Sequence, residues 1–142
     1  MKRLLYSSFF FLLFFAACNN NKQEEIVAAE NDLDAARNFI RAALDGEYDK
    51  ARNYMLKDSL NVQLLNTFED NYKSSMSRND KQSYKESSIR IPGVRKVDDS
   101  TSIVSYSNSY KNQVDSLKVV RVNDQWLVDF KYSFSSKPED DN

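Results

Sequence analysis

A single α+β domain is predicted by the sequence, with helices first and an antiparallel sheet after them. In the first half of the chain, apolar residues recur every three or four positions, which is the period of a helix with one buried face. Beyond about residue 80 the period changes to two, and Val, Ile and Tyr become frequent, as in strands. Short polar turns separate the strand segments, so neighbouring strands should run antiparallel. A length of 142 residues leaves room for one such domain.

The first two helices should form a bent hairpin. The apolar stripe of the first helix comprises Leu33, Ala36, Phe39, Ile40, Ala43 and Leu44. Gly46 follows this stripe, and glycine commonly ends a helix because it adopts the left-handed conformation without strain. A second, shorter stripe with Tyr48, Ala51 and Met55 comes directly afterwards. The join Asp45-Gly46-Glu47 is therefore tight, which favours two helices over one continuous rod.

A third helix should begin near Asp58-Ser59, because either side chain can cap its first turn. Its apolar stripe comprises Leu60, Leu64, Leu65, Phe68, Tyr72 and Met76. Three helices that each carry one apolar face need a surface to cover, and the second half of the chain supplies it.

The sheet should contain about four strands. The predicted strand segments are residues 84–91, 94–97, 101–110, 114–122 and 126–134. Ile91-Pro92-Gly93 interrupts the first two segments, and this combination indicates a turn or a bulge. The last segment has the clearest alternation, in which one face carries Trp126, Val128, Phe130, Tyr132 and Phe134.

The first 25 residues have the plan of a secretory signal. Lys2 and Arg3 give a positive start, residues 4–17 form a mostly apolar run, and a polar stretch follows. A membrane-spanning helix needs about 20 apolar residues, so this run is short for a permanent span. The end of the run, Phe15-Ala16-Ala17-Cys18, resembles a bacterial lipoprotein signal, although most such signals have Leu at the position of Phe15.

The lipoprotein resemblance implies cleavage between Ala17 and Cys18 and attachment of lipid to the Cys18 thiol, which gives firm membrane anchoring. Two alternatives stay open: an ordinary secretory signal with an incidental cysteine, and an uncleaved anchor. Lys22-Gln23-Glu24-Glu25 resembles the acidic signal that sends some Bacteroidota lipoproteins to the cell surface, and a charged tether is the alternative. We therefore expect an outer-membrane lipoprotein of the cell envelope, on its periplasmic face or at the cell surface. The expected organisation is a signal peptide (1–17), a lipidated tether (18–28), a folded domain (29–134) and a disordered tail (135–142).

Two stretches of the expected domain resemble NTF2-like (cystatin-like) proteins. Residues 36–51, ARNFIRAALDGEYDKA, resemble the opening helix hairpin of that fold, and residues 119–129, VVRVNDQWLVD, resemble its last hairpin. Small secreted lipoproteins with a DUF4878-type domain share the same outline. The resemblance implies a strongly curved antiparallel sheet wrapped around helices, with a conical cavity between them.

The composition argues against several classes of function. Histidine is absent and Cys18 is the single cysteine, which excludes Cys/His nucleophilic sites and Cys-based zinc or iron–sulfur sites. Two glycines leave no phosphate-binding glycine loop, and 20 basic against 21 acidic residues leave no concentrated basic face for nucleic acid. We therefore expect no metal, no cofactor and no nucleic-acid partner.

Several residues are candidates for a site, each with a structural alternative. Tyr106, Tyr110, Trp126 and Tyr132 could line a ligand pocket, although core packing explains them equally well. Asp129 could act as a general base if burial raised its pKa, but its strand position favours a solvated residue. The charged residues of the helix hairpin should form a solvated face; they are Arg37, Arg41, Asp45 and Lys50.

The leading functional hypothesis is a non-catalytic, lipid-anchored envelope protein whose domain binds a small ligand or a protein partner. No motif of a known enzyme class supports catalysis. One alternative is a cavity enzyme of the isomerase or dehydratase kind that uses a carboxylate and a Tyr. Another is a structural or assembly role in the envelope, with a partner on the open face of the sheet.

Overall fold

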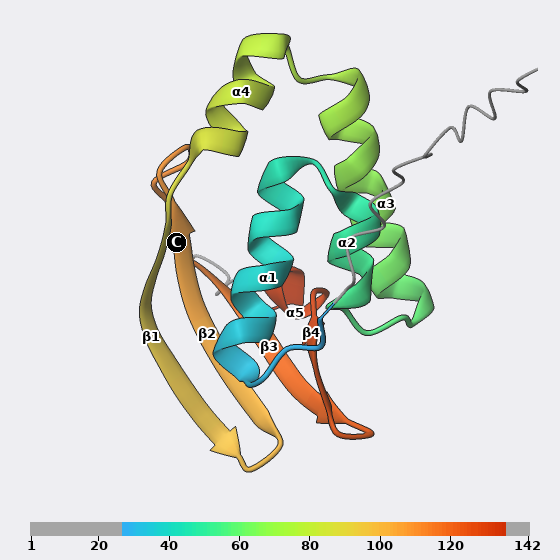
Figure 1. Ribbon diagram of the computed structural model, residues 1–142, viewed down its shortest axis with the longest axis vertical. Helices are drawn as coiled ribbons and strands as arrows, with labels where there is room; N and C mark the ends of the chain where they lie inside the picture. Colours follow the sequence, from blue (N-terminus) through green and yellow to red (C-terminus); the bar gives the residue numbers. More distant parts are fainter. Residues whose placement is uncertain (1–26, 136–142) are drawn as a thin grey trace, which may run out of the picture.

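Residues 27–135 are described by the computed structural model, and they form helices packed against one curved antiparallel sheet (Figure 1). The helices before the sheet are α1 (Asp32–Asp45), α2 (Tyr48–Asn53), α3 (Ser59–Ser74) and α4 (Arg78–Glu86). The sheet and last helix are β1 (Ile89–Asp98), β2 (Thr101–Asn108), β3 (Asp115–Val122), β4 (Gln125–Asp129) and α5 (Tyr132–Ser135). The predicted signal peptide, Cys18 and the tail after Ser135 lie outside the described residues. The α+β class is confirmed.

The strands lie in the order β1-β2-β3-β4, and each neighbouring pair is antiparallel, as the short turns predict. The interruption at Pro92-Gly93 is a bulge, because the register of β1 against β2 shifts between Arg90 and Gly93. Asn123 and Asp124 join β3 to β4 with φ angles of 48° and 61°. Two positive φ angles in a two-residue loop match the right-handed twist of the strands that the loop connects.

The two edges of the sheet differ in their cover. Residues 54–56 run beside β4, where the Val128 N–H donates to the Tyr54 carbonyl (2.8 Å) and the Val128 carbonyl accepts from Leu56 (2.9 Å). On the other side, β1 pairs with β2 alone. The bulge and Pro92 interrupt this second edge, which discourages the pairing of a further strand.

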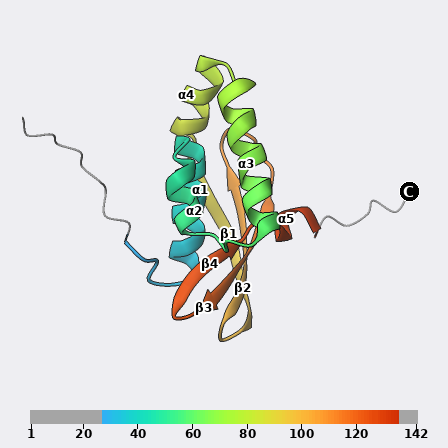
Figure 2. The ribbon, with the colours of Figure 1, turned by 90° about the vertical axis from the view of Figure 1, so that its right-hand side faces the viewer.

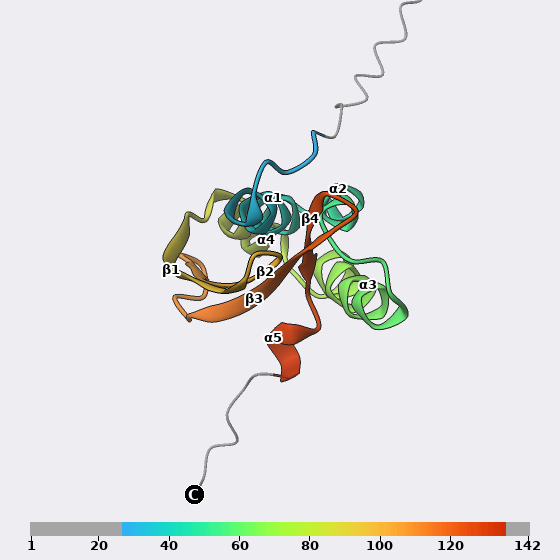
Figure 3. The ribbon, with the colours of Figure 1, turned by 90° about the horizontal axis from the view of Figure 1, so that it is seen from below.

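α1 lies across the sheet and contacts all four strands (Figures 1 and 3). Gly46 ends it in the left-handed conformation (φ 78°), as the sequence predicts. Asp32 in its first turn is buried and accepts hydrogen bonds from Lys96 Nζ (2.6 Å) and from Ser102. The apolar part of its buried face is Ala35, Ala36, Phe39, Ile40, Ala42 and Leu44.

α3 begins at its predicted cap. The Asp58 carboxylate accepts the backbone N–H groups of Leu60 and Asn61, both at 3.1 Å. Together with α4, the far end of α3 extends beyond the sheet, at the end opposite the β1–β2 turn (Figures 1 and 2). Within residues 27–135, no helix combines the length and the apolar character needed to cross a membrane.

The prediction of a strand from residue 84 is wrong, since residues 78–86 form α4 and β1 begins at Ile89. No residue of this short helix is buried, so its sequence shows no clear apolar stripe. Ser77 starts the helix by accepting the Asp80 N–H (3.1 Å). Arg41, expected to be solvated, ties α1 to its end by donating to the carbonyls of Lys85 (2.7 Å) and Ser87 (2.9 Å).

The prediction of one strand from Trp126 to Phe134 is also wrong, because β4 ends at Asp129 and α5 begins at Tyr132. The helical turn brings Phe130 and Phe134 together, with ring centroids 5.2 Å apart. Ser133 Oγ donates to the Ser116 carbonyl (2.7 Å), so α5 lies where a longer β4 would pair with β3. In the view from below, α5 lies on the side of β3 away from α1 (Figure 3).

Candidate functional site

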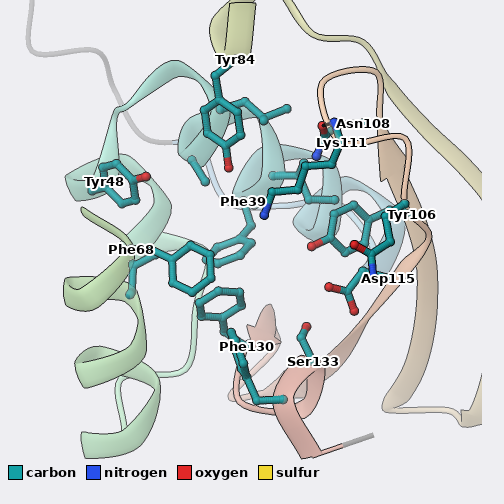
Figure 4. A pocket seen from close by; sticks show the side chains of 16 residues that line it. Phe39, Tyr48, Phe68, Tyr84, Tyr106, Asn108, Lys111, Asp115, Phe130 and Ser133 are labelled. Atoms are coloured by element: carbon teal, nitrogen blue, oxygen red, sulfur yellow. Dashed lines mark hydrogen bonds between the residues drawn. The ribbon is translucent and has the colours of Figure 1, made fainter. Parts of the chain in front are cut away.

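A pocket of about 270 Å³ lies between the helices and the upper part of the sheet, which is the end that carries the β2–β3 loop (Figure 4). Because β4 stops at Asp129, the upper part of β3 has no strand partner on that side, and helical residues border the pocket instead. The lining residues come from α1, α2, α3, α4, β2, the β2–β3 loop, the start of β3, and the segment through α5. They are Phe39, Ile40, Ala43, Leu44, Tyr48, Leu65, Phe68, Tyr84, Tyr106, Asn108, Lys111, Gln113, Asp115, Phe130, Ser133 and Phe134.

Phenylalanine rings form the floor of the pocket on the side of α1, α3 and α5. Phe130 is the centre of this group, with its ring centroid 5.2 Å from Phe39 and 5.3 Å from Phe68. Phe134 completes it, at 5.8 Å from Phe68. The tilted and edge-on geometries are those that aromatic pairs favour, so the four rings stabilise one another as the apolar floor of the pocket.

A chain of tyrosine rings closes the upper end. Tyr48 of α2 packs on Tyr72 of α3 (5.7 Å between centroids), and Tyr72 packs on Tyr84 of α4 (6.2 Å). Tyr84 in turn meets Tyr110 after β2, at 5.4 Å. Burial, with smaller contributions from neighbouring tyrosines, raises the pKa values of Tyr48 and Tyr84. Their hydroxyl groups therefore stay protonated at neutral pH.

The sheet side of the pocket carries the polar groups. In Figure 4 the polar ends of Tyr106, Lys111 and Asp115 extend from this side toward Phe39 and Phe68. Tyr106 and Asp115 are register partners on β2 and β3. Burial and then the nearby charge of Asp115 raise the pKa of Tyr106, so its hydroxyl remains neutral.

Asn108 fixes the loop that carries Lys111. Its Oδ1 accepts the backbone N–H groups of Tyr110 (3.1 Å) and Lys111 (3.0 Å), and its carbonyl accepts the N–H of Asn112 (2.9 Å). Asn112 has a φ of 54°, a conformation that asparagine tolerates better than most residues. The loop between β2 and β3 is thereby shaped by its own backbone contacts.

Of the predicted pocket residues, Tyr106 is among those that line this pocket. Tyr110 packs on Tyr84 with 39% of its surface exposed, and neither it nor Tyr132 is among the lining residues. Trp126 lies at a second hollow of about 240 Å³ near Tyr54 and Val27. Its ring is flanked by Lys96 Nζ (5.3 Å) and the Arg121 guanidinium (5.9 Å). The structure therefore does not bring the predicted residues together.

Asp129 is not the solvated strand residue that its position suggests; it is 7% exposed. Its carboxylate accepts hydrogen bonds from Asn61 Nδ2 (3.1 Å) and Lys131 Nζ (2.5 Å). α3 covers Asp129 through Asn61. The Asn61 side chain is completely buried, and its Oδ1 also accepts the Lys131 backbone N–H (2.8 Å). The cluster joins α3 to the end of β4, and Asp129 is not among the residues that line the pocket.

Sequence reasoning missed the pocket residues Tyr84, Asn108, Lys111 and Asp115. Tyr84 fell in a segment interpreted as strand, and the other three lie in or beside a turn of ordinary polar composition. Asn112 indicates in the sequence that this turn has a defined shape, because asparagine tolerates a positive φ. Nothing in the sequence indicates that the turn faces a cavity. In the described part of the chain, no three acidic side chains cluster closely enough to hold a metal ion.

No family model matches the chain, and no curated protein matches it. Among solved structures, it is similar to an NTF-2 like protein of unknown function from Shewanella oneidensis MR-1, with a TM-score of 0.50 and 14% sequence identity. The match covers 68% of this chain and 89% of that one. At this identity the likeness concerns the fold alone. The domain therefore has the NTF2-like fold that its two hairpins suggest.

Proposed function

We propose that this protein binds a small, largely apolar ligand in the pocket between its helices and its sheet, without catalysing a reaction. The observation that carries the proposal is the lining, which combines seven aromatic rings with a few polar groups that converge on one side. The rings are those of Phe39, Tyr48, Phe68, Tyr84, Tyr106, Phe130 and Phe134. This composition is typical of small-molecule sites. A polar solvent-filled cleft would not concentrate aromatic side chains in this way.

The pocket volume sets the size of the ligand. About 270 Å³ lies slightly below the range of roughly 300–1,000 Å³ for drug-sized ligands. The ligand is therefore small, such as a molecule with one or two rings or a short acyl chain. Each buried ring or methylene contributes through the removal of apolar surface from water, at about 25 cal/mol per Å².

The proposal includes an envelope location. The resemblance of residues 15–18 to a lipoprotein signal supports lipid attachment at Cys18, as in Bacteroidota-type lipoproteins with a DUF4878-type domain. From Cys18 to Val27 the chain has nine peptide links, which span at most about 30 Å when extended. The domain would then work close to the membrane, on the periplasmic face or at the cell surface. A protein partner in the envelope would then deliver the ligand to the domain or receive it from the domain.

The ligand proposal is tested with a neutral probe, 1-naphthaleneacetamide, and the full chain as the cell processes it, held in phospholipid nanodiscs. We expect saturable binding by calorimetry, after subtraction of protein-free nanodiscs. Ala43 lines the pocket, so Ala43→Phe fills it and should abolish this binding. Ala28→Phe is the matched control, because Ala28 lies at the second hollow. Binding that survives Ala43→Phe would contradict the proposal.

The anchor proposal is tested by metabolic labelling with an alkyne fatty acid. We expect the wild-type chain to carry the label and to sediment with membranes. Cys18→Ser should lose both the label and the membrane association, because the thioether needs a thiol. A Cys18→Ser protein that still sediments with membranes would indicate an uncleaved anchor instead.

A second candidate function is a cavity enzyme, and one observation favours it. Tyr106 and Asp115 pair across β2 and β3, and both reach into the pocket (Figure 4). A carboxylate beside a neutral tyrosine is suited to moving a proton next to a carbonyl group. The test is exchange of the α-protons of 1-indanone in D₂O, followed by NMR. Exchange that the wild type accelerates and Asp115→Asn does not would favour the enzyme; equal rates support binding alone.

A further inference from the structure

We infer that the pocket selects a ligand with a single negative charge, a monocarboxylate whose head group binds Lys111 and Asn108 while its apolar body lies on the phenylalanine rings. The inference rests on the proposed function, because it names the ligand class for the same site. It follows from three features: an unpaired cation, oriented hydrogen-bond donors beside it, and one carboxylate that limits the charge of the ligand.

Lys111 is the unpaired cation. Of the lining residues within 27–135, it alone is positively charged, and its ammonium makes no hydrogen bond or ion pair with another described residue. In Figure 4 its Nζ extends toward Phe39 and Phe68 rather than away from the pocket. Lys96 and Lys131, by contrast, each pair with a buried carboxylate, that of Asp32 and that of Asp129. An anion bound here would give the Lys111 ammonium a charge-assisted hydrogen bond that no described residue supplies.

Asn108 supplies an oriented donor beside Lys111. Its Oδ1 is held by the N–H groups of Tyr110 and Lys111, which fixes the amide plane. The Nδ2 group then remains as a donor in a buried residue that lines the pocket, and no described residue accepts from it. The same contacts position the backbone of Lys111, so both donors belong to one preorganised loop.

Tyr106 adds a third donor on the same side of the pocket. Its hydroxyl group makes no hydrogen bond with another described residue, and it points toward the rings in Figure 4. Its raised pKa keeps the hydroxyl protonated, so it can donate to an anion across the neutral pH range. Three donors without acceptors indicate that the ligand brings the acceptor atoms.

Asp115 limits the charge that the site accepts. Its Oδ1 accepts the Ser116 N–H (2.8 Å), and no ion pair joins it to Lys111. This carboxylate lines the pocket, so it repels a dianion such as a phosphate monoester more strongly than a monoanion. Lys111 supplies the one positive charge among the lining residues, and Asp115 opposes a second negative charge on the ligand, which favours a carboxylate over a phosphate.

The test compares matched probes that differ in charge: 1-naphthaleneacetate, its neutral amide 1-naphthaleneacetamide, and the dianion 1-naphthyl phosphate. Binding to the full chain in phospholipid nanodiscs is measured by calorimetry against protein-free nanodiscs. We expect the carboxylate to bind about three- to tenfold more tightly than the amide, the range for a partly exposed charge-assisted contact. Lys111→Met should remove this preference, because it should weaken binding of the carboxylate more than binding of the amide. Lys118→Met is the matched control, since Lys118 is a β3 residue outside the pocket lining.

The outcomes separate this inference from the function on which it rests. Equal affinity of the wild type for the carboxylate and the amide, with both lost in Ala43→Phe, would overturn the inference and leave ligand binding intact. Lys111→Met that weakens both probes equally would also overturn it, because Lys111 would then shape the pocket without recognising charge. Tighter binding of the phosphate than of the carboxylate would refute the monoanion preference. If no probe shows binding that Ala43→Phe abolishes, the proposed ligand-binding function itself is contradicted.

Discussion

The ring of Tyr72 lies where a side chain at position 46 would have to stand: a Cβ added to Gly46 would be 2.6 Å from the Tyr72 Cζ and Oη atoms. Gly46 also has a φ of 78°, which strains any residue with a Cβ. The end of α1 and the upper end of the pocket therefore depend on the same glycine, since Tyr72 packs between Tyr48 and Tyr84.

Gly46→Ala should destabilise the domain by about 2–4 kcal/mol, the sum of left-handed strain and overpacking against Tyr72. The free energy of unfolding from urea denaturation is the measurement. Gly93→Ala is the matched control, because a Cβ at Gly93 meets no atom within 4 Å. We expect a change of about 0.5 kcal/mol or less for the control. Equal effects of the two substitutions would contradict the close packing at Tyr72.

Asn61→Ala should cost about 2–4 kcal/mol of stability, because it leaves buried polar partners without hydrogen bonds. Asn61 is completely buried and connects Asp58, Asp129 and the Lys131 backbone. Thermal and urea unfolding measure the loss. Asn71→Ala, on an exposed position of the same helix, should leave the stability nearly unchanged. If Asn61→Ala is as mild as Asn71→Ala, the polar cluster does not hold α3 on β4.

The stability of the domain should fall in acid, partly because of Asp58. Hydrogen bonds from the Asn61 backbone and from Lys131 lower the pKa of Asp58 from 3.8 to about 2. A carboxyl group whose pKa is lowered in the folded state stabilises the fold at pH values above its ordinary pKa. This contribution is lost as the pH falls from about 4 to about 2. Urea denaturation across this range should show the decline. Asp58→Asn should reduce its slope, whereas Asp99→Asn in the exposed β1–β2 turn should not; unchanged slopes in both would contradict the role of Asp58.

Alkaline conditions should also weaken the fold, through the buried Tyr48 and the partly buried Tyr84 and Tyr106. Burial raises the pKa values of Tyr48, Tyr84 and Tyr106 above the ordinary value of 10.0. An acid whose pKa is raised in the folded state stabilises the fold below its ordinary pKa, and this contribution is lost as the pH rises above about 10. Tyrosinate absorbance and unfolding free energy measure the change together. Tyr106→Phe should flatten this alkaline decline more than Tyr110→Phe, because Tyr110 is the more exposed of the two.

Local signals predicted several elements correctly. Gly46 ends α1, Asp58 caps α3, Pro92-Gly93 marks a bulge in β1, and the Asn123-Asp124 loop turns β3 into β4. Each of these signals acts within about four residues, through a cap, a positive φ angle or a missing donor. Such effects hold whatever the rest of the chain does, so they can be recognised in the sequence.

The errors have a different origin. Contacts with distant residues hold residues 78–86 and 132–135 in place: Arg41 binds the end of α4, and Ser116 and Phe68 contact α5. Residues 78–86 contain Tyr84 as their one large apolar residue, and residues 126–134 alternate as a strand does, so neither segment shows the apolar stripe of a helix. Asp129 was assigned to the solvated face for the same reason, since only the position of α3 buries it.

The sequence by itself determined the α+β order of elements and most of the caps and turns, because these depend on near neighbours. Its composition also determined that the chain has no histidine and too few glycines for a phosphate-binding glycine loop. The pocket was decided by the tertiary structure alone. It brings Phe39, Tyr84, Lys111 and Phe130 to one cavity from four separate elements or loops. No local pattern encodes that meeting, because it depends on where β4 stops, how α4 leads back to β1 and how Asn108 shapes its loop.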